Sequence, residues 1–284
     1  MNLPDDFQFS QGSLQDFVEC RRRFYLRYIR RLAWPAVQSE PVLEFERYMQ
    51  QGKQFHRMVQ QHQVGVPLER LTPMAQGEEL SRWWLNYLSH SGEKGSLQWL
   101  AEGSSQRYAE ISLSIQVGST RLVAKYDLLV VTSEGRAVIF DWKTARKRPR
   151  RQWLAAHLQT RVYPYLLVRV GAHLNQGRPF EPEQVEMVYW FANFPEQAER
   201  FPYNQNAFNS DGEYLAELIS NVQQLEEAEF TLTTDGRRCA FCVYRSLCER
   251  GDQAGMLADY ESEIEAGEGL ELELDFEQIQ EIEY

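Results

Sequence analysis

Two aspartates and a lysine stand out in the segment AKYDLLVVTSEGRAVIFDWKT, residues 124–144. Asp127, Asp141 and Lys143 lie among Val, Ile, Leu, Phe and Tyr residues, a composition typical of β-strands. Two neighbouring carboxylates form a hard oxygen site for Mg²⁺ or Mn²⁺. A lysine beside them can stabilise charge that develops on a phosphate. The plainer alternative is that Asp127 caps a turn and that Asp141 and Lys143 form a surface ion pair.

The short sequence TSEGR between the two apolar runs predicts a β-hairpin with a loop of residues 133–135. The glycine of this loop would take the left-handed conformation, and Thr132 would pair with Arg136. Counting outward then sets Asp127 opposite Asp141, and the two-residue period of a strand brings the lysine back to the same face. Opposed carboxylates repel each other. The hairpin therefore predicts a cation between the two acids.

The cysteines form a second group with a possible metal-binding role. Cys239, Cys242 and Cys248 follow the pattern C-x2-C-x5-C, and Cys20 lies 219 residues before the first of them. Four thiolates suit zinc or an iron–sulfur cluster. Inert buried cysteines are the alternative, which three cysteines within ten residues disfavour. Zinc sites usually pair two C-x2-C motifs, and the spacing alone leaves zinc and iron open.

Basic residues gather in the segments 20–31 and 143–151, each with six lysines or arginines. Either segment could be a solvated helix face. Two such clusters, one of which begins at Lys143, favour contact with a phosphate backbone. In the second segment, the residues predicted to bind nucleic acid are Arg146, Lys147, Arg148, Arg150 and Arg151.

The net charge of −11 is concentrated at the end of the chain. Residues 252–284 hold 12 acids and no lysine or arginine, so residues 1–251 carry a net charge of +1. This contrast predicts one domain over 1–251 and an acidic tail over 252–284. Acidic tails are usually disordered and solvating. The alternating LELELDF within this one could instead add as a strand to a sheet edge, compete with DNA for the basic segment, or dock a protein partner.

The sequence has no apolar run of about 18 residues, so no membrane span or membrane partner is expected. Its start, MNLPDDFQFS, lacks the basic and apolar regions of a secretion signal. These features predict a cytoplasmic protein, in which disulfides are improbable.

Apolar periodicity predicts helices interspersed with a mostly antiparallel sheet, which indicates an α/β or α+β domain. Strands are expected at 107–116, 121–131, 136–143 and 184–194. Helices are expected at 13–31 with Ser13 as N-cap, at 41–65, at 76–90, from about residue 152, and at 212–227. His56 lies in the second helix among apolar residues, where a histidine is more often structural. Gln159 and Tyr163 share one face of the helix that follows the hairpin, where Pro164 should kink it.

Five motifs in this order resemble the PD-(D/E)XK nuclease superfamily, and its RecB-like branch in particular. They are GKQFH, KYD, FDWKT, QTRVY and the split cysteine set, and they cover about residues 10–250. The cysteine set is similar to that of the iron–sulfur members, which are CRISPR-associated adaptation nucleases, the AddB nuclease domain and exonuclease five. The acidic tail is not part of this pattern.

The resemblance implies a restriction-endonuclease-like α/β core, with a central mixed sheet and a catalytic β-hairpin flanked by helices. The implied activity is that of a Mg²⁺- or Mn²⁺-dependent DNA nuclease. It would be an exonuclease on single-stranded DNA or DNA ends, in DNA repair and recombination or in CRISPR spacer adaptation. The alternative is a non-cleaving nucleic-acid binding module with a structural metal cluster, which has no need of opposed carboxylates.

The resemblance also implies roles for particular residues. His56, Asp127, Asp141 and the backbone carbonyl of Trp142 would bind the metal, and Lys143 would position the attacking water. Gln159 and Tyr163 would contact nucleic acid or orient the site. A [4Fe–4S] cluster that joins the two ends of the domain would be held by Cys20, Cys239, Cys242 and Cys248.

Overall fold

The structure is a computed structural model that describes residues 3–4, 6–33, 40–92, 95–100, 105–240 and 242–251. The acidic tail over 252–284, and with it the alternative of a strand in LELELDF, lies outside the described residues. No helix in the described ranges is both long enough and apolar enough to cross a membrane.

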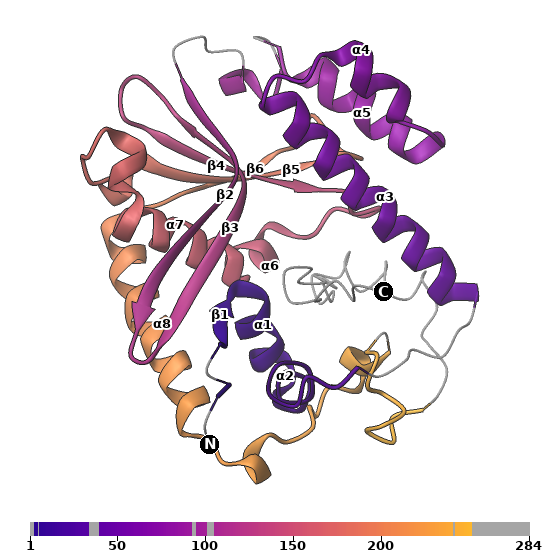
Figure 1. Cartoon of the computed structure of the whole chain (residues 1–284), viewed down its shortest axis with the longest axis vertical. Helices are drawn as coiled ribbons and strands as arrows, with labels where there is room; N and C mark the ends of the chain where they lie inside the picture. The colour runs from indigo at the N-terminus through magenta and orange to yellow at the C-terminus, as the bar shows by residue number, and fades with distance from the viewer. Residues whose placement is uncertain are drawn as a thin grey trace.

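One mixed sheet forms the centre of the fold (Figure 1). Its strands run in the order β1-β3-β4-β5-β6, and β2 pairs with the other edge of β3. The β1–β3 and β4–β5 pairs are parallel and the others are antiparallel. The strands are β1 (Gln8–Ser10), β2 (Gln106–Val117), β3 (Thr120–Val131), β4 (Ala137–Lys143), β5 (Val185–Phe191) and β6 (Glu199–Pro202).

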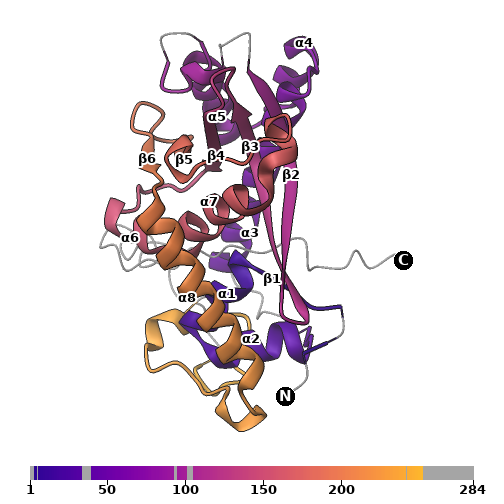
Figure 2. The same cartoon turned by 90° about the vertical axis from the view of Figure 1, so that its left-hand side faces the viewer.

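Helices cover both faces of the sheet, with α3, α4 and α5 on one side and α1, α7 and α8 on the other (Figures 1 and 2). The two ends of the described chain meet near α2, at the foot of the molecule in Figure 1. The helices are α1 (Gln11–Glu19), α2 (Arg21–Phe24), α3 (Glu40–Gln63), α4 (Leu68–Leu71), α5 (Glu78–His90), α6 (Arg151–Ala156), α7 (Leu158–Val170) and α8 (Gln205–Gln224).

Two apolar clusters fill the spaces between the sheet and its helices. Alternate residues of β4 divide between them: Ile139 packs in the cluster beneath α7, and Phe140 packs in the cluster beneath α3 and α5. All seven residues of β4 are buried. The strand is therefore covered on both faces, as central strands of α/β sheets are. The expected α/β fold with a central mixed sheet is confirmed.

The predicted hairpin has the predicted register. The Thr132 N–H donates to the Arg136 carbonyl over 2.9 Å, and Gly135 has a φ of 79°, in the left-handed region. The pairs from Leu128↔Phe140 to Val131↔Ala137 follow the same count. The loop chemistry thus fixes the register, as expected for a three-residue loop with a left-handed glycine.

The helix expected over 13–31 is instead three consecutive elements: α1, α2 and the π-helix η1 (Tyr25–Ile29). Cys20 separates the first two with an extended backbone, φ −158° and ψ 103°. Ser10, rather than Ser13, is the N-cap of α1, because the two serines form a reciprocal capping box. The break sets Cys20 at the junction of two helices.

The helix that follows the hairpin is also divided, at His157, which lies between α6 and α7 with φ −68° and ψ 140°. Pro164 does not end the helix, because α7 runs through it to Val170. The short strands β1 and β6 were not predicted, and α8 begins at Gln205, seven residues before the expected start.

Candidate active site

One edge of β3 pairs with two different strands, and Asp127 lies between the two paired segments. β1 pairs with residues 121–123 of β3, and β4 pairs with residues 128–131. At Asp127, β4 bonds to the side chain of β3 instead of to its backbone: the Trp142 backbone N–H donates to Asp127 Oδ2 over 2.9 Å. The carboxylate thus takes the place of a backbone acceptor where the ladder ends.

The side-chain alternation of β3 also changes at Asp127. Tyr126 and Leu129 pack in the same apolar cluster although they are three residues apart, whereas strict alternation would put them on opposite faces. The facing strand is irregular at Glu110, which has a φ of 56° although it is not glycine. The distortion on both strands lets Asp127 contact a helix from the far side of the sheet.

That helix is α3, which contributes His56. The His56 Nδ1 atom lies 3.4 Å from Asp127 Oδ2. Burial disfavours the charged imidazole, but the Asp127 carboxylate outweighs it and raises the pKa of His56. Burial likewise opposes the Asp127 charge, but His56 and the Trp142 N–H lower the pKa of Asp127. The two side chains therefore form a charged pair.

The motif GKQFH allows α3 to approach the end of β4. A Cβ atom on Gly52 would lie 3.0 Å from Thr144 Oγ1, so a larger residue would require Thr144 or the helix to shift by a few tenths of an ångström. Phe55 is fully buried against the aromatic residues of the second cluster, including Trp190. This packing fixes the rotation of α3 and presents His56, the next residue, to Asp127.

Asp141 and Lys143 lie on one face of β4, as the two-residue period predicts. The Lys143 Nζ atom is 3.1 Å from Asp141 Oδ2, and both side chains are about nine-tenths buried. Gln159 on α7 joins the pair from above: its Nε2 donates to Asp141 Oδ1 over 2.5 Å, and its Oε1 accepts from Lys143 Nζ over 3.2 Å. Gln159 therefore fixes the orientation of both charged groups.

His56, Asp127, Asp141, Lys143 and Gln159 are referred to below as the candidate catalytic cluster. They come from α3, β3, β4 and α7, and the charges of Asp141 and Lys143 both act on His56. Two carboxylates and an imidazole are suitable ligands for a divalent cation. In the described part of the chain, however, no three His, Cys, Asp or Glu side chains are already arranged to hold a metal ion. The donor types fit a cation, while the carboxylates are engaged by protein donors.

Tyr163 belongs to the core beneath α7, although it follows Gln159 by one helical turn. Its side chain is buried, and its ring lies 4.9 Å from that of Tyr126, whose hydroxyl donates to the Tyr163 carbonyl over 2.8 Å. Of the two predicted helix residues, only Gln159 has a described contact with the charged pair.

The basic segment after β4 is engaged by carboxylates of the protein. Arg148 and Arg151 both pair with Glu199 at the start of β6. Arg146 lies 3.4 Å from Glu79 and 4.4 Å from the ring centroid of Tyr48. The remaining two predicted contacts are Lys147, which is half-buried, and Arg150, which is exposed before α6. DNA would compete with Glu199 and Glu79 for three of these five cations.

Asn193 was not singled out from the sequence. It follows β5, and its Nδ2 donates to the carbonyls of Thr144 and Ala145 over 3.1 and 2.9 Å. Its Oδ1 accepts from Trp83 Nε1 of α5 over 2.8 Å. It therefore ties the chain that leaves Lys143 to the helices on the far face. No local pattern could reveal this link, since its partners are 48 or more residues away.

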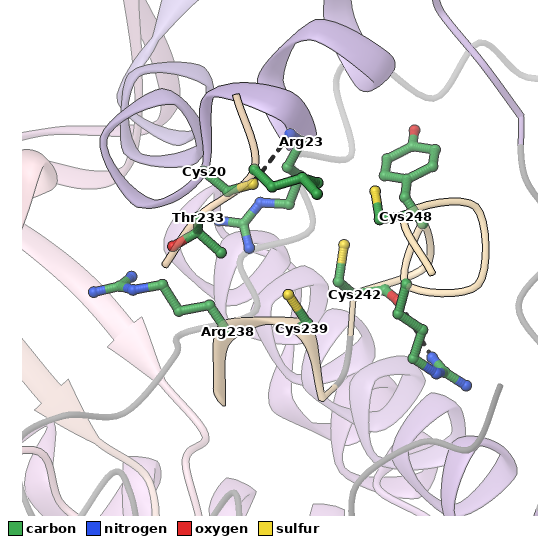
Figure 3. A pocket seen from close by; sticks show the side chains of 10 residues that line it. Cys20, Arg23, Thr233, Arg238, Cys239, Cys242 and Cys248 are labelled. Carbon is green, nitrogen blue, oxygen red and sulfur yellow. Dashed lines mark hydrogen bonds between the residues drawn. The ribbon is translucent and has the colours of Figure 1, made fainter. Parts of the chain in front are cut away.

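The four cysteines line one pocket, although they come from opposite ends of the chain (Figure 3). Cys20 lies between α1 and α2, and its Sγ accepts from the Arg23 N–H over 3.4 Å. Cys239 ends η7 (Gly236–Cys239), and Cys242 and Cys248 follow in turns. Figure 3 shows the four sulfur atoms directed toward a common space. This set is called the cysteine pocket below.

The thiols of the cysteine pocket are close enough to influence one another. Burial raises the pKa of Cys239 and Cys248, and the charge of Cys20 raises both further. Burial also raises the pKa of Cys242, to about 11. The side chains of Arg23, Arg238 and Arg245 line the same pocket, which gives an anionic group cationic neighbours.

The chain belongs to the PD-(D/E)XK nuclease superfamily, whose family model matches residues 8–249. It is thus a member of a superfamily of nucleases that generally use divalent metals such as Mg²⁺ or Mn²⁺. This confirms the superfamily that the motifs resemble.

Two solved structures are similar to the chain at low identity. A candidate exonuclease from Eubacterium rectale has a TM-score of 0.47 and 8% identity over 76% of this chain and 79% of that one. The protein SSO0001 has a TM-score of 0.38 and 12% identity over 87% of this chain and 88% of that one. A search of curated proteins finds no match.

Proposed function

We propose that this protein is a metal-dependent deoxyribonuclease, an exonuclease that acts on single-stranded DNA or DNA ends. The observation that supports this most is the convergence of the candidate catalytic cluster from four separate elements. His56, Asp127 and Asp141 supply ligands for a cation, and Lys143 supplies a positive charge beside them. A module that only binds DNA gains nothing from two acids in this position.

In the proposed mechanism, His56, Asp127 and Asp141 would hold a divalent cation, together with the backbone carbonyl of Trp142. His56 would release its proton on binding, because only the neutral imidazole has a lone pair for a metal. A bound cation would supply Lewis-acid polarisation of the phosphate and of the attacking water. The ammonium group of Lys143 lies beside Asp141 and would stabilise the negative charge that develops on the phosphate oxygens. Gln159 holds the ammonium group by its Oε1 atom, so that this charge is already oriented before the reaction.

The test is cleavage of end-labelled single- and double-stranded DNA, with each end labelled in turn, in Mg²⁺, Mn²⁺ or chelator. The proposal predicts metal-dependent release of short products from one labelled end. The matched control is Asp141→Asn, which should bind the same DNA and leave it intact. Binding without cleavage by the wild-type protein in both metals would favour the non-cleaving module instead.

We also propose that the cysteine pocket holds a [4Fe–4S] cluster, as in the iron–sulfur members of the RecB-like branch, and that it staples residues 1–251 into one nuclease domain. Four thiols lining one pocket supply the ligand number that such a cluster needs. The cluster binds each thiolate through a different iron, whereas zinc draws four ligands around one ion. In the part of the chain that the structure describes, no three of these side chains are already arranged around one metal ion.

Anaerobically purified protein should then be brown, with broad absorption and about four irons per chain. Stoichiometric zinc without iron in such preparations would overturn the iron assignment and leave the nuclease proposal standing.

A further inference from the structure

The carboxylate of Glu19 joins α1 to the segment that carries three of the four cysteines. Glu19 precedes Cys20 and is buried. Its Oε1 atom lies 3.1 Å from Arg238 Nη1, and Arg238 precedes Cys239. The same carboxylate pairs with Arg23 on α2. A movement of either cysteine-bearing segment would therefore displace the Glu19 carboxylate or break one of its ion pairs.

Gln15 lies one helical turn before Glu19 and bonds to it directly. Gln15 Nε2 donates to Glu19 Oε1 over 3.0 Å, which is the oxygen that Arg238 also approaches. The other end of the same amide faces α7: Gln15 Oε1 accepts from the Leu158 backbone N–H over 3.3 Å. The Gln15 side chain thus connects the Glu19–Arg238 ion pair, beside the cysteine pocket, to Leu158, the first residue of α7.

The Leu158 N–H is one of the groups at a helix start that has no partner within the helix. The N-cap residue, His157, makes no side-chain capping bond, so Gln15 supplies an acceptor from α1 instead. The next residue is Gln159, whose amide holds both Asp141 and Lys143. The start of α7 therefore connects the two sites of the molecule.

We propose that Gln15 is a positioning residue for the nuclease reaction: it holds the first turn of α7, and through it Gln159, in register with the cysteine-bearing segment. The effect on catalysis rests on the proposed function. The chain of contacts runs Arg238, Glu19, Gln15, Leu158 and Gln159. When the cysteine-bearing segment moves away, α1 releases the start of α7, and Lys143 loses its fixed orientation.

Two substitutions of Gln15 separate its contact with Leu158 from its contact with Glu19. Gln15→Leu removes both the acceptor for Leu158 and the donor for Glu19. Gln15→Glu keeps an acceptor at the start of α7, where negative charge is favourable, but repels Glu19. Val18→Ala on the same helix is the matched control, because the Val18 side chain is half exposed.

Amide hydrogen exchange of the full-length protein, followed by mass spectrometry, tests the link without any reference to cleavage. Gln15→Leu should accelerate exchange at the start of α7 while α8 stays protected. Gln15→Glu should accelerate it less, because it keeps the acceptor for Leu158 and loses only the contact with Glu19, and Val18→Ala should leave it unchanged. Arg238→Ala alone should also accelerate exchange of the amides at the start of α7. In the double variant Gln15→Leu/Arg238→Ala, exchange should be little faster than in Gln15→Leu alone. Unchanged exchange in Gln15→Leu, or full additivity with Arg238→Ala, would overturn the proposal.

The kinetic readout separates positioning from a general loss of stability. Gln15→Leu should lower kcat by about ten- to a hundredfold with KM nearly unchanged, since small displacements of a reacting group have effects of this order. Gln15→Glu should retain more of the wild-type kcat than Gln15→Leu, because it keeps the acceptor for the Leu158 N–H. Equal losses in both variants would overturn the positioning role. If no variant, wild type included, cleaves DNA, the proposed function fails while the exchange pattern still decides the link.

Discussion

The candidate catalytic cluster and the cysteine pocket are built in opposite ways. The first comes from long elements, and β4, which carries Asp141 and Lys143, is buried throughout. The second is formed by a helix junction and by turns, and its four cysteines are only half-buried. Three apolar side chains near the pocket are about 40% exposed: Leu232, Val243 and Leu247.

This difference indicates what each site needs in order to keep its shape. Hydrogen bonds and ion pairs of the protein already hold the side chains of the candidate catalytic cluster, within a sheet packed on both faces. The cysteine pocket closes a loop of more than 200 residues, so a bound cluster would contribute much to the stability of this junction. The catalytic cluster should therefore be sensitive to single charges, and the cysteine pocket to loss of its ligands.

The largest expected effect comes from removing the Lys143 charge. Lys143→Gln should lower kcat by about a thousandfold or more, because a charge that acts on the transition state is lost. It also leaves the Asp141 carboxylate buried without its ammonium partner, at a cost of about 3–5 kcal/mol in unfolding free energy.

The double variant Asp141→Asn/Lys143→Gln separates these two effects. Denaturant unfolding should show that it regains much of the stability, because no uncompensated charge remains buried, while cleavage stays absent. Wild-type cleavage by Lys143→Gln would show that the catalytic assignment is wrong.

The second effect concerns the cysteine pocket. Cys239→Ser should lose the iron of the proposed cluster and accelerate hydrogen exchange in residues 10–33 and 230–250. Without the cluster these segments keep side-chain contacts and the backbone hydrogen bond from the Arg22 N–H to the Thr231 carbonyl. Exchange in β3 and β4 should change little. Val243→Ala, an exposed neighbour, is the control. Equally accelerated hydrogen exchange in the sheet strands would show that the candidate catalytic cluster depends on the cysteine pocket for its stability, contrary to the comparison.

The third effect concerns DNA binding by the basic segment. Arg150→Ala should weaken binding of all sequences and lower the salt slope by about one, without loss of stability, because Arg150 is exposed. Arg148→Ala should also lower the melting temperature, because Glu199 loses one of its two arginines. Fluorescence anisotropy over a range of salt, with thermal melts, measures both. Equal melting temperatures for the two variants would contradict this distinction.

Local chemistry predicted much of the fold. The register of the hairpin followed from a three-residue loop with Gly135, and the shared face of Asp141 and Lys143 followed from the period of a strand. His56 could be placed on a helix from apolar spacing. The break in alternation at Asp127 could not be predicted, because it depends on Glu110 in the facing strand, and β1 was too short to show a pattern.

Long-range pairings were the other part that the sequence could not reveal. Glu199 neutralises Arg148 and Arg151 from about 50 positions away, so a run of basic residues seemed more available for DNA than it is. Likewise, Gln15 reaches Leu158 across 143 positions. Such contacts depend on the packing of α1, α7 and β6, and local propensity carries no information about them.

The smallest expected effect comes from removing the charge of Asp211 on α8. This buried carboxylate lies outside both the candidate catalytic cluster and the cysteine pocket. Its Oδ2 accepts from the Tyr203 hydroxyl over 3.0 Å, and burial raises the pKa of Asp211. By contrast, charged and hydrogen-bonding neighbours lower the pKa of Asp127 despite its burial.

A raised pKa favours the folded state at low pH, and this contribution is lost as pH rises through the folded pKa. Asp211→Asn should therefore melt slightly higher than wild type at pH 7, and the difference should vanish below the ordinary pKa of 3.8. Thermal melts between pH 3 and 7 measure this. A lower melting temperature for the variant at pH 7 would show that the charge of Asp211 stabilises the fold.

The central claim is that the candidate catalytic cluster, and not the cysteine pocket, holds the divalent cation of the reaction. The most direct measurement is Mn²⁺ binding, followed by electron paramagnetic resonance, in wild type, Asp127→Asn, Asp141→Asn and Cys239→Ser. Both aspartate variants should bind Mn²⁺ at least tenfold more weakly, because each loses a charged oxygen ligand. Cys239→Ser should bind like wild type. Wild-type Mn²⁺ binding by both aspartate variants would contradict the account.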